Sequence, residues 1–190
     1  MFSAPDSFSG YSYLTCANPM GLPAGSSART LSAVASFFIN ATDSRTRFAL
    51  GWGINSGGQR FSLSLGKRLA GQWRPAIDTA AEAIEAANAL DAGVSYLFTF
   101  LHDGGASLDG GASLDGGRFF INGAAATTTY FAGPSMQTLA APLDIGRLGN
   151  WNHPSDAHNG RIAEVLIYAT ALSPSERLLV DTYLKTKYGL

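Results

Sequence analysis

The amino-acid sequence predicts an all-β fold of the sandwich or barrel kind, followed by one α-helix at the C-terminus. Short apolar runs rich in β-branched and aromatic residues recur along the chain, and glycine or small polar residues bound them. One run alternates as a half-buried strand does, with Phe61, Leu63 and Leu65 on one side and Ser62 and Ser64 on the other. Strands that repeat with turn signals at this spacing are typical of sandwiches and barrels.

The predicted strands follow one another through most of the chain. The clearest runs are Thr30–Ile39, Arg47–Ile54, Phe61–Leu65, Val94–His102, Arg118–Ile121, Pro142–Ile145 and Ile162–Tyr168, and the weaker ones are Tyr11–Leu14, Gln72–Ile77 and Thr127–Phe131. The run Val94–His102 is apolar on both faces, which predicts a central strand between two layers.

Turn signals separate these runs. Asn122-Gly123 directly follows a strand run, and this pair suits the two positive φ angles of a type I′ hairpin turn. The residues from Asn55 to Gly58 likewise separate two runs. The segment Ala80–Ala89 is rich in alanine and glutamate, so its composition suits either a short helix or a weak strand of small residues.

The C-terminus carries a helix signature. Ser173-Pro174-Ser175-Glu176 combines an N-cap serine, a proline at the first helical position and the glutamate of a capping box. Apolar residues then recur at helical spacing up to Leu184, and Gly189 supplies a stop. These signals predict an α-helix over about residues 174–188.

Composition limits the classes of function. The chain has 190 residues, which predicts a single domain over residues 1–190, and only 14% of them are charged. A net charge of −1 without a basic stripe argues against nucleic acid, and the apolar runs are too short to span a bilayer. The lone Cys16 is expected to be a small buried residue.

An internal repeat precedes the Asn-Gly turn. The hexapeptide Gly-Ala-Ser-Leu-Asp-Gly occurs at residues 105–110 and again at 111–116, and its composition predicts a flexible loop over 103–117. Asp103, Asp109 and Asp115 fall every six residues, which makes them weak candidates for a calcium site. We expect a loop lengthened by duplication and no bound cofactor.

Several stretches together resemble a known family. They are Leu22–Ala33, Arg118–Gly123, Pro142–Arg147 and Gly160–Tyr168, the last followed by Ala171-Leu172-Ser173 and Glu176-Arg177. The first resembles the opening strand region of laminin G-like, concanavalin A-like domains of the bacterial and phage type, and the last resembles their closing strand and helix. This resemblance implies a two-sheet antiparallel jelly-roll sandwich with a short C-terminal helix. It also implies a mostly non-catalytic domain that binds glycans or proteins, in some members with calcium at the rim.

The sequence does not predict an enzyme. Retaining glycoside hydrolysis needs two carboxyl groups about 5 Å apart, and Glu164 has no carboxylate at i±2 or i±4. Glu82 and Glu85 are close in sequence but lie in an alanine-rich segment without a catalytic pattern. We therefore expect Glu164 to be a structural residue.

The densest polar segment predicts a binding loop. Trp151 offers an aromatic surface for a sugar ring or another chain, and amide or carboxylate groups surround it on Asn150, Asn152, Asp156 and Asn159. A second reading, a zinc site of His153, Asp156 and His158, is disfavoured because Pro154 argues against the helix that such spacing would need.

The other two tryptophans differ. Trp52 lies within a strand pattern and is expected in the core, whereas Trp73, beside Arg74, suits either an exposed binding platform or a partly buried edge.

Two functions of different class remain open. The first is a phage virion component, such as a capsid decoration, head-fibre or tail-associated protein; Met1 directly ahead of the domain favours it, since phage proteins need no signal peptide. The second is a carbohydrate-binding or adhesion module of a longer bacterial extracellular protein. The expected partners are other virion proteins, cell-surface glycans or both, and a homo-oligomer is left open.

Overall fold

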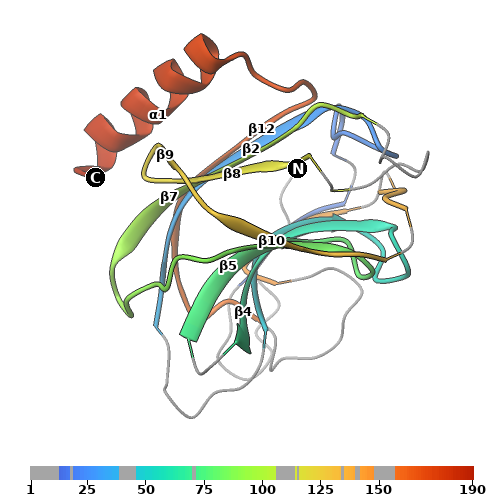
Figure 1. Ribbon diagram of the computed structural model, residues 1–190, viewed down its shortest axis with the longest axis horizontal. Helices are drawn as coiled ribbons and strands as arrows, with labels where there is room; N and C mark the ends of the chain where they lie inside the picture. Colours follow the sequence, from blue (N-terminus) through green and yellow to red (C-terminus); the bar gives the residue numbers. More distant parts are fainter. Residues whose placement is uncertain are drawn as a thin grey trace.

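Two antiparallel β-sheets face one another, and one helix lies outside the smaller sheet (Figure 1). The structure is a computed structural model that describes residues 13–17, 19–38, 46–69, 72–105, 114, 116–133, 135–139, 142–147 and 157–190, with the backbone alone for 66–69. The seven-stranded sheet has the order β1-β11-β3-β4-β5-β6-β10, and the five-stranded sheet has the order β12-β2-β7-β8-β9. The two-sheet sandwich with a C-terminal helix is confirmed.

The strand bounds follow the predicted runs closely. They are β1 (Leu14–Cys16), β2 (Arg29–Phe37), β3 (Arg47–Gly53), β4 (Arg60–Leu69), β5 (Gln72–Asp78), β6 (Ala83–Ala86), β7 (Ser95–His102), β8 (Arg118–Ile121), β9 (Ala124–Ala125), β10 (Thr128–Phe131), β11 (Leu143–Ile145) and β12 (Gly160–Tyr168). The segment Ala80–Ala89 contributes the strand β6. Its pairing with β5 and β10 outweighs the helical propensity of alanine.

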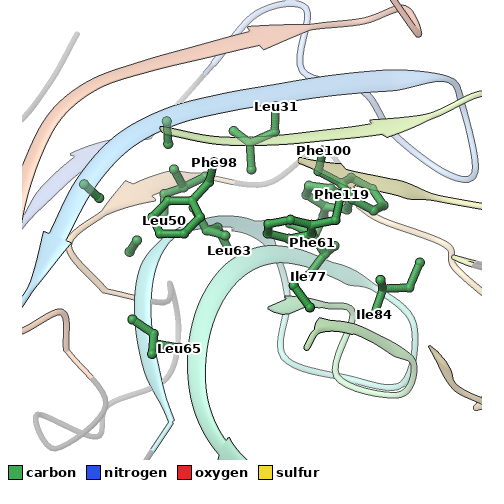
Figure 2. Close-up of a cluster of buried hydrophobic side chains, with 14 of the residues drawn as sticks. Leu31, Leu50, Phe61, Leu63, Leu65, Ile77, Ile84, Phe98, Phe100 and Phe119 are labelled. Atoms are coloured by element: carbon green, nitrogen blue, oxygen red, sulfur yellow. The ribbon is translucent and has the colours of Figure 1, made fainter. Parts of the chain in front are cut away.

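The core lies between the two sheets. Phe98 and Phe100 of β7 face alternating apolar residues of β4, and the rings of Phe61 and Phe100 lie 5.8 Å apart across the gap (Figure 2). Trp52 is 1% exposed and donates its indole N–H to the carbonyl of Pro23 at 2.9 Å, so its predicted place in the core is confirmed. Cys16 is buried, also as expected.

The predicted turn and helix are confirmed. Asn122 and Gly123 have φ angles of 52° and 84°, which fit the type I′ hairpin between β8 and β9. The helix α1 spans Pro174–Tyr188, with a complete capping box at Ser173 and a left-handed Gly189 after its last turn. Leu184 packs α1 onto the outer face of the five-stranded sheet.

Candidate functional site

A cavity of about 220 Å³ lies where the edge strand β1 of one sheet approaches the edge strand β12 of the other. Its walls come from the start of the chain, from the end of β11 and from the start of β12. The lining residues are Tyr13, Leu14, Ile145, Gly146, His158, Gly160 and Ile162. The lining residues Gly146 and His158 lie in sequence on either side of the segment 148–156, which holds most of the predicted binding loop.

Backbone hydrogen bonds bring both ends of that segment together. The N–H of His158 donates to the carbonyl of Gly146 at 2.8 Å, and Gly146 in turn donates to Ala49 at 2.7 Å. On the other side, Phe38 donates to the carbonyl of Asn159 at 2.7 Å. The cavity walls are thus held by both sheets, which favours a largely preformed site.

Gly160 allows the close approach of β12 to β2 beside the cavity. A Cβ atom at this position would lie 1.9 Å from the carbonyl oxygen of Ser36 and 2.8 Å from Nε2 of His158. No real Cβ contact is that short, so a larger residue would displace the strand or the imidazole. The wall of the cavity depends on glycine here.

His158 supplies a neutral imidazole to the cavity wall. Its ring packs edge-on against Phe37 with centroids 4.7 Å apart. Burial lowers the pKa of His158 to about 4, and the nearby backbone of Arg161 and Ser36 offsets this only in part. No well-formed hydrogen bond from the described residues reaches either ring nitrogen. At neutral pH the ring is therefore uncharged.

A cation, an aromatic ring and a carboxylate meet beside the cavity. The guanidinium of Arg147 lies 3.3 Å from the ring centroid of Tyr13, and its Nε lies 3.7 Å from Oδ2 of Asp144. The side chain of Asp144 is 1% exposed and accepts a hydrogen bond from the Thr15 hydroxyl. Burial raises the pKa of Asp144, while the bond from Thr15 and the charge of Arg147 oppose that rise.

Strand register extends this group across the outer face of the seven-stranded sheet. Thr15 lies opposite Asp144, which lies opposite Gly51, and the same row continues through Ser62 to Asp78. Asp78 pairs with Arg60, and Glu85 lies 3.7 Å from Arg74.

Exposure distinguishes the three arginine–carboxylate pairs on this face of the seven-stranded sheet. The side chain of Arg147 is 31% exposed, against 17% for Arg74 and 7% for Arg60. The pair nearest the cavity is therefore the most accessible to a ligand.

The predicted site residues fall into two groups. Asn150, Trp151, Asn152 and Asp156 lie outside the described residues, as does His153, while Asn159 is exposed and lies in sequence between the cavity residues His158 and Gly160. Their role in binding stays a prediction.

Trp73 and Arg74 are not part of the cavity. They lie on β5, three strands from β11 in the sheet order. Trp73 is 8% exposed and lies in the core, so it is more buried than either alternative and its indole offers no exposed platform. Arg74 is held by Glu85 and by Gln72 at 3.0 Å.

The weak calcium candidates remain untested. The carboxylate of Asp103 accepts the N–H of Gly105 at 2.9 Å within its own turn, and Asp109 and Asp115 lie outside the described residues. Across the described ranges no three His, Cys, Asp or Glu side chains gather as metal ligands. The same ranges contain no helix long and apolar enough to cross a membrane.

The carboxylates considered for hydrolysis have other contacts. Glu164 accepts from Tyr183, Lys187 and Tyr188 of α1, so it joins β12 to the helix. Glu82 is buried and accepts the Tyr130 hydroxyl at 2.6 Å.

Comparison with known proteins gives one family match. The model for the concanavalin A-like lectin/glucanases superfamily matches residues 8–176. No curated protein sequence matches the chain significantly.

Solved structures share the fold at low sequence identity. A heptameric SAP-like pentraxin from Limulus polyphemus has a TM-score of 0.61 and 16% identity over 92% of this chain and 78% of its own. The enzymatically active domain of tailspike protein 2 from bacteriophage CBA120 has a TM-score of 0.58 and 16% identity, over 96% of this chain but 29% of its own. The CBM40 of the Ruminococcus gnavus IT-sialidase, bound to α2,3-sialyllactose, has a TM-score of 0.55 and 14% identity, over 95% and 98% of the two chains.

Proposed function

Because the chain belongs to the concanavalin A-like lectin/glucanases superfamily, we propose that it is a non-catalytic module that binds carbohydrate at the cavity between β1, β11 and β12. The observation that carries this proposal is the partly exposed Arg147, which lies next to Asp144 and stacks on Tyr13, a residue that lines the cavity. Guanidinium and carboxylate groups can donate to and accept from neighbouring sugar hydroxyls, while aromatic and aliphatic walls contact the apolar face of the ring.

The size of the cavity suits one sugar residue. A volume of about 220 Å³ is below the roughly 300–1,000 Å³ of pockets that enclose drug-sized ligands. We therefore expect recognition of one ring at the end or branch of a glycan, with further contacts from the segment that contains Trp151.

The distance between Asp144, beside the cavity, and Asp78 of the same row favours binding over hydrolysis there. Glycosidases place two carboxyl groups about 5–9.5 Å apart. Asp144 and Asp78 share a row but are separated by β3 and β4, so three strand spacings of about 4.8 Å put them roughly 14 Å apart. Asp78 is in addition paired with Arg60.

A glycan array followed by calorimetry tests this proposal. Arg147→Ala should raise the Kd of the tightest glycan ligand by tenfold or more, since a hydrogen bond to a charged group contributes about 1.5–3 kcal/mol. Arg118→Ala is the matched control, because Arg118 is exposed on the five-stranded sheet, away from the cavity. Equal loss in both variants, unchanged affinity in Arg147→Ala, or no glycan bound at all would contradict it.

A second candidate, a role in a phage virion, has one specific support. The match with the CBA120 tailspike domain covers 96% of the present chain. In that case other virion proteins would be partners, and the protein would be found in purified particles; a location on the cell surface would favour the alternative of a bacterial adhesion module. Mass spectrometry of purified particles and of the cell-surface fraction from the source distinguishes the two.

A further inference from the structure

An aromatic ring and an arginine lie together on the outer face of the five-stranded sheet, at the end where β12 begins. Phe38, directly after β2, is 43% exposed, and the guanidinium carbon of Arg161 lies 5.7 Å from the centroid of its ring. Ile162 packs against the core, so the alternation of a strand directs the neighbouring Arg161 to the opposite, outer face. The contact between the two side chains places Phe38 on this face as well.

The helix α1 covers a different part of the outer face. It packs on Val34 and Leu97, which are buried together with Leu184 of the helix. Phe38 lies four residues after Val34, beyond the covered part of the sheet, and both Phe38 and Arg161 remain exposed there. Aromatic and arginine side chains contribute much of the binding energy at interfaces, so this pair is suited to hold a ligand.

The surrounding backbone holds the Phe38 ring in place. The N–H of Phe38 donates to the carbonyl of Asn159 at 2.7 Å, and the carbonyl of Phe37 accepts the N–H of Gly93 at 2.7 Å. A Cβ atom at Gly93 would lie 3.9 Å from Cε1 of Phe38, so the ring passes beside the turn that precedes β7. A side chain that is ordered before binding loses little conformational entropy when a ligand arrives.

The charge of Arg161 is not paired with a carboxylate among the described residues. The Phe38 ring is the side-chain group that its guanidinium contacts. Ion pairs with carboxylates engage other arginines of the described chain, namely Arg60, Arg74, Arg147 and Arg177. An exposed guanidinium presents several N–H donors in one plane, which suits the oxygens of a carboxylate or another oxyanion.

This surface adjoins the cavity of the proposed site. Gly160 and Ile162, on either side of Arg161 in sequence, line the cavity, and Asn159 beside them is exposed. Gly160 has no side chain, so the edge of the sheet is narrow at this point. A glycan with its end residue in the cavity can therefore pass Gly160 and place its next residue over Phe38.

We propose that Phe38 and Arg161 form a second subsite, which stacks the next sugar ring on Phe38 and selects an acidic group on that ring through Arg161. This inference rests on the proposed binding of carbohydrate in the cavity. It adds the length and the charge of the glycan, which has at least two residues and carries a carboxylate or a sulfate on the second. The aromatic face contacts the apolar face of the sugar, and the guanidinium donates to the acidic group.

Matched single sugars and disaccharides test the second subsite. The probes are methyl glycosides of hexoses and N-acetylhexosamines, and disaccharides that end in the same sugars with a second residue that is neutral, a uronic acid or sulfated. NMR titration of the ¹⁵N-labelled full chain measures each Kd up to the millimolar range. The Kd of an acidic disaccharide should be about tenfold or more below that of its neutral counterpart. The amides of Phe38 and Arg161 should shift with disaccharides and not with single sugars.

Two variants separate the ring from the charge. Arg161→Ala should abolish the preference for acidic disaccharides, and Phe38→Ala should raise the Kd of neutral and acidic disaccharides by about fivefold. Both should leave the Kd of single sugars unchanged. Arg118→Ala is the matched control and should bind as the wild type does, because Arg118 is an exposed arginine beside the far end of β7. If circular dichroism shows that Phe38→Ala does not fold, Phe38→Leu replaces it, since leucine keeps the apolar bulk without the ring face.

The outcomes distinguish this inference from the proposed function. An acid preference lost in Arg161→Ala and a disaccharide affinity weakened in the Phe38 variant, with single sugars unaffected, support the second subsite. Single sugars that bind and lose affinity in Arg147→Ala keep the cavity site. In that case, equal affinity for neutral and acidic disaccharides, or a gain that survives in either variant, overturns the second subsite alone. A wild type that binds none of the probes overturns both.

Discussion

Arg147 owes its expected role to planarity as well as to charge. Its guanidinium stacks over the Tyr13 ring while its Nε faces Asp144. The ammonium of lysine is a compact charge that cannot reproduce both contacts, so a lysine here would not be a conservative change. The Thr15 hydroxyl holds the carboxylate of Asp144 in place. Arg147 is therefore the charged side chain of this pair that can adjust to a ligand.

His158 makes the stability of the cavity wall depend on pH. Its pKa falls from 6.5 to about 4 in the folded protein because the ring is buried. Between these two values the unfolded chain binds more protons than the folded one, so stability decreases as the pH falls through this window. Above about pH 6.5 this contribution is complete.

We therefore predict that the melting temperature of the wild type falls between pH 7 and pH 4 more steeply than that of His158→Gln. Thermal melting over a pH series of both proteins measures the difference, and the shared fall from other groups cancels. Parallel curves for the two proteins would show that His158 titrates as it does in the unfolded chain. A steeper fall in the variant would also contradict the prediction.

At the scale of elements, the repeat loop is anchored more firmly than its composition indicates. Leu114, in the second hexapeptide, is fully buried in the core, and its N–H donates to Oε2 of Glu82 at 3.1 Å. Small polar residues predict a flexible loop, but the leucine of the second repeat reaches the core. The end of the loop nearest β8 is therefore structural.

A substitution in the second copy of the repeat should lower the unfolding free energy more than deletion of the first copy. Leu114→Ala should cost about 2–5 kcal/mol of unfolding free energy, as large-to-small core substitutions do. Deletion of residues 105–110 keeps Leu114 in an unchanged local sequence and shortens only the loop, so it should cost less than about 1 kcal/mol. Urea unfolding of both variants measures this. Equal costs would contradict the anchor, and a calcium-dependent stability lost on deletion would instead support a metal site.

Local chemistry explains which elements could be predicted. Alternation marks β4, the Asn122-Gly123 pair marks a hairpin, and the capping box at Ser173 marks α1, because each signal is complete within a few residues. The composition of the segment around β6 did not distinguish a helix from a strand. Its strand form depends on pairing with β5 and β10, which local sequence does not specify.

At the scale of the whole molecule, the site is assembled from distant parts of the chain. Sequence reasoning indicated the segment around Trp151 and Asn159, but it missed Tyr13, Asp144 and Arg147. The pairing of β1 with β11 brings Thr15 opposite Asp144 across 129 positions, and no local signal encodes that register. The available hints were the weak strand Tyr11–Leu14 and the position of Arg147 directly after a strand run, beside the predicted loop.

The most direct test of the binding site is a titration of the ¹⁵N-labelled protein with the tightest glycan from the array, followed by two-dimensional NMR. Amide shifts should concentrate at Gly146, His158 and Gly160, around the cavity, and stay small on Gln72–Asp78. Shifts confined to Gln72–Asp78 and Ala83–Ala86, or no shift with any glycan, would contradict carbohydrate binding at the edge between β1, β11 and β12.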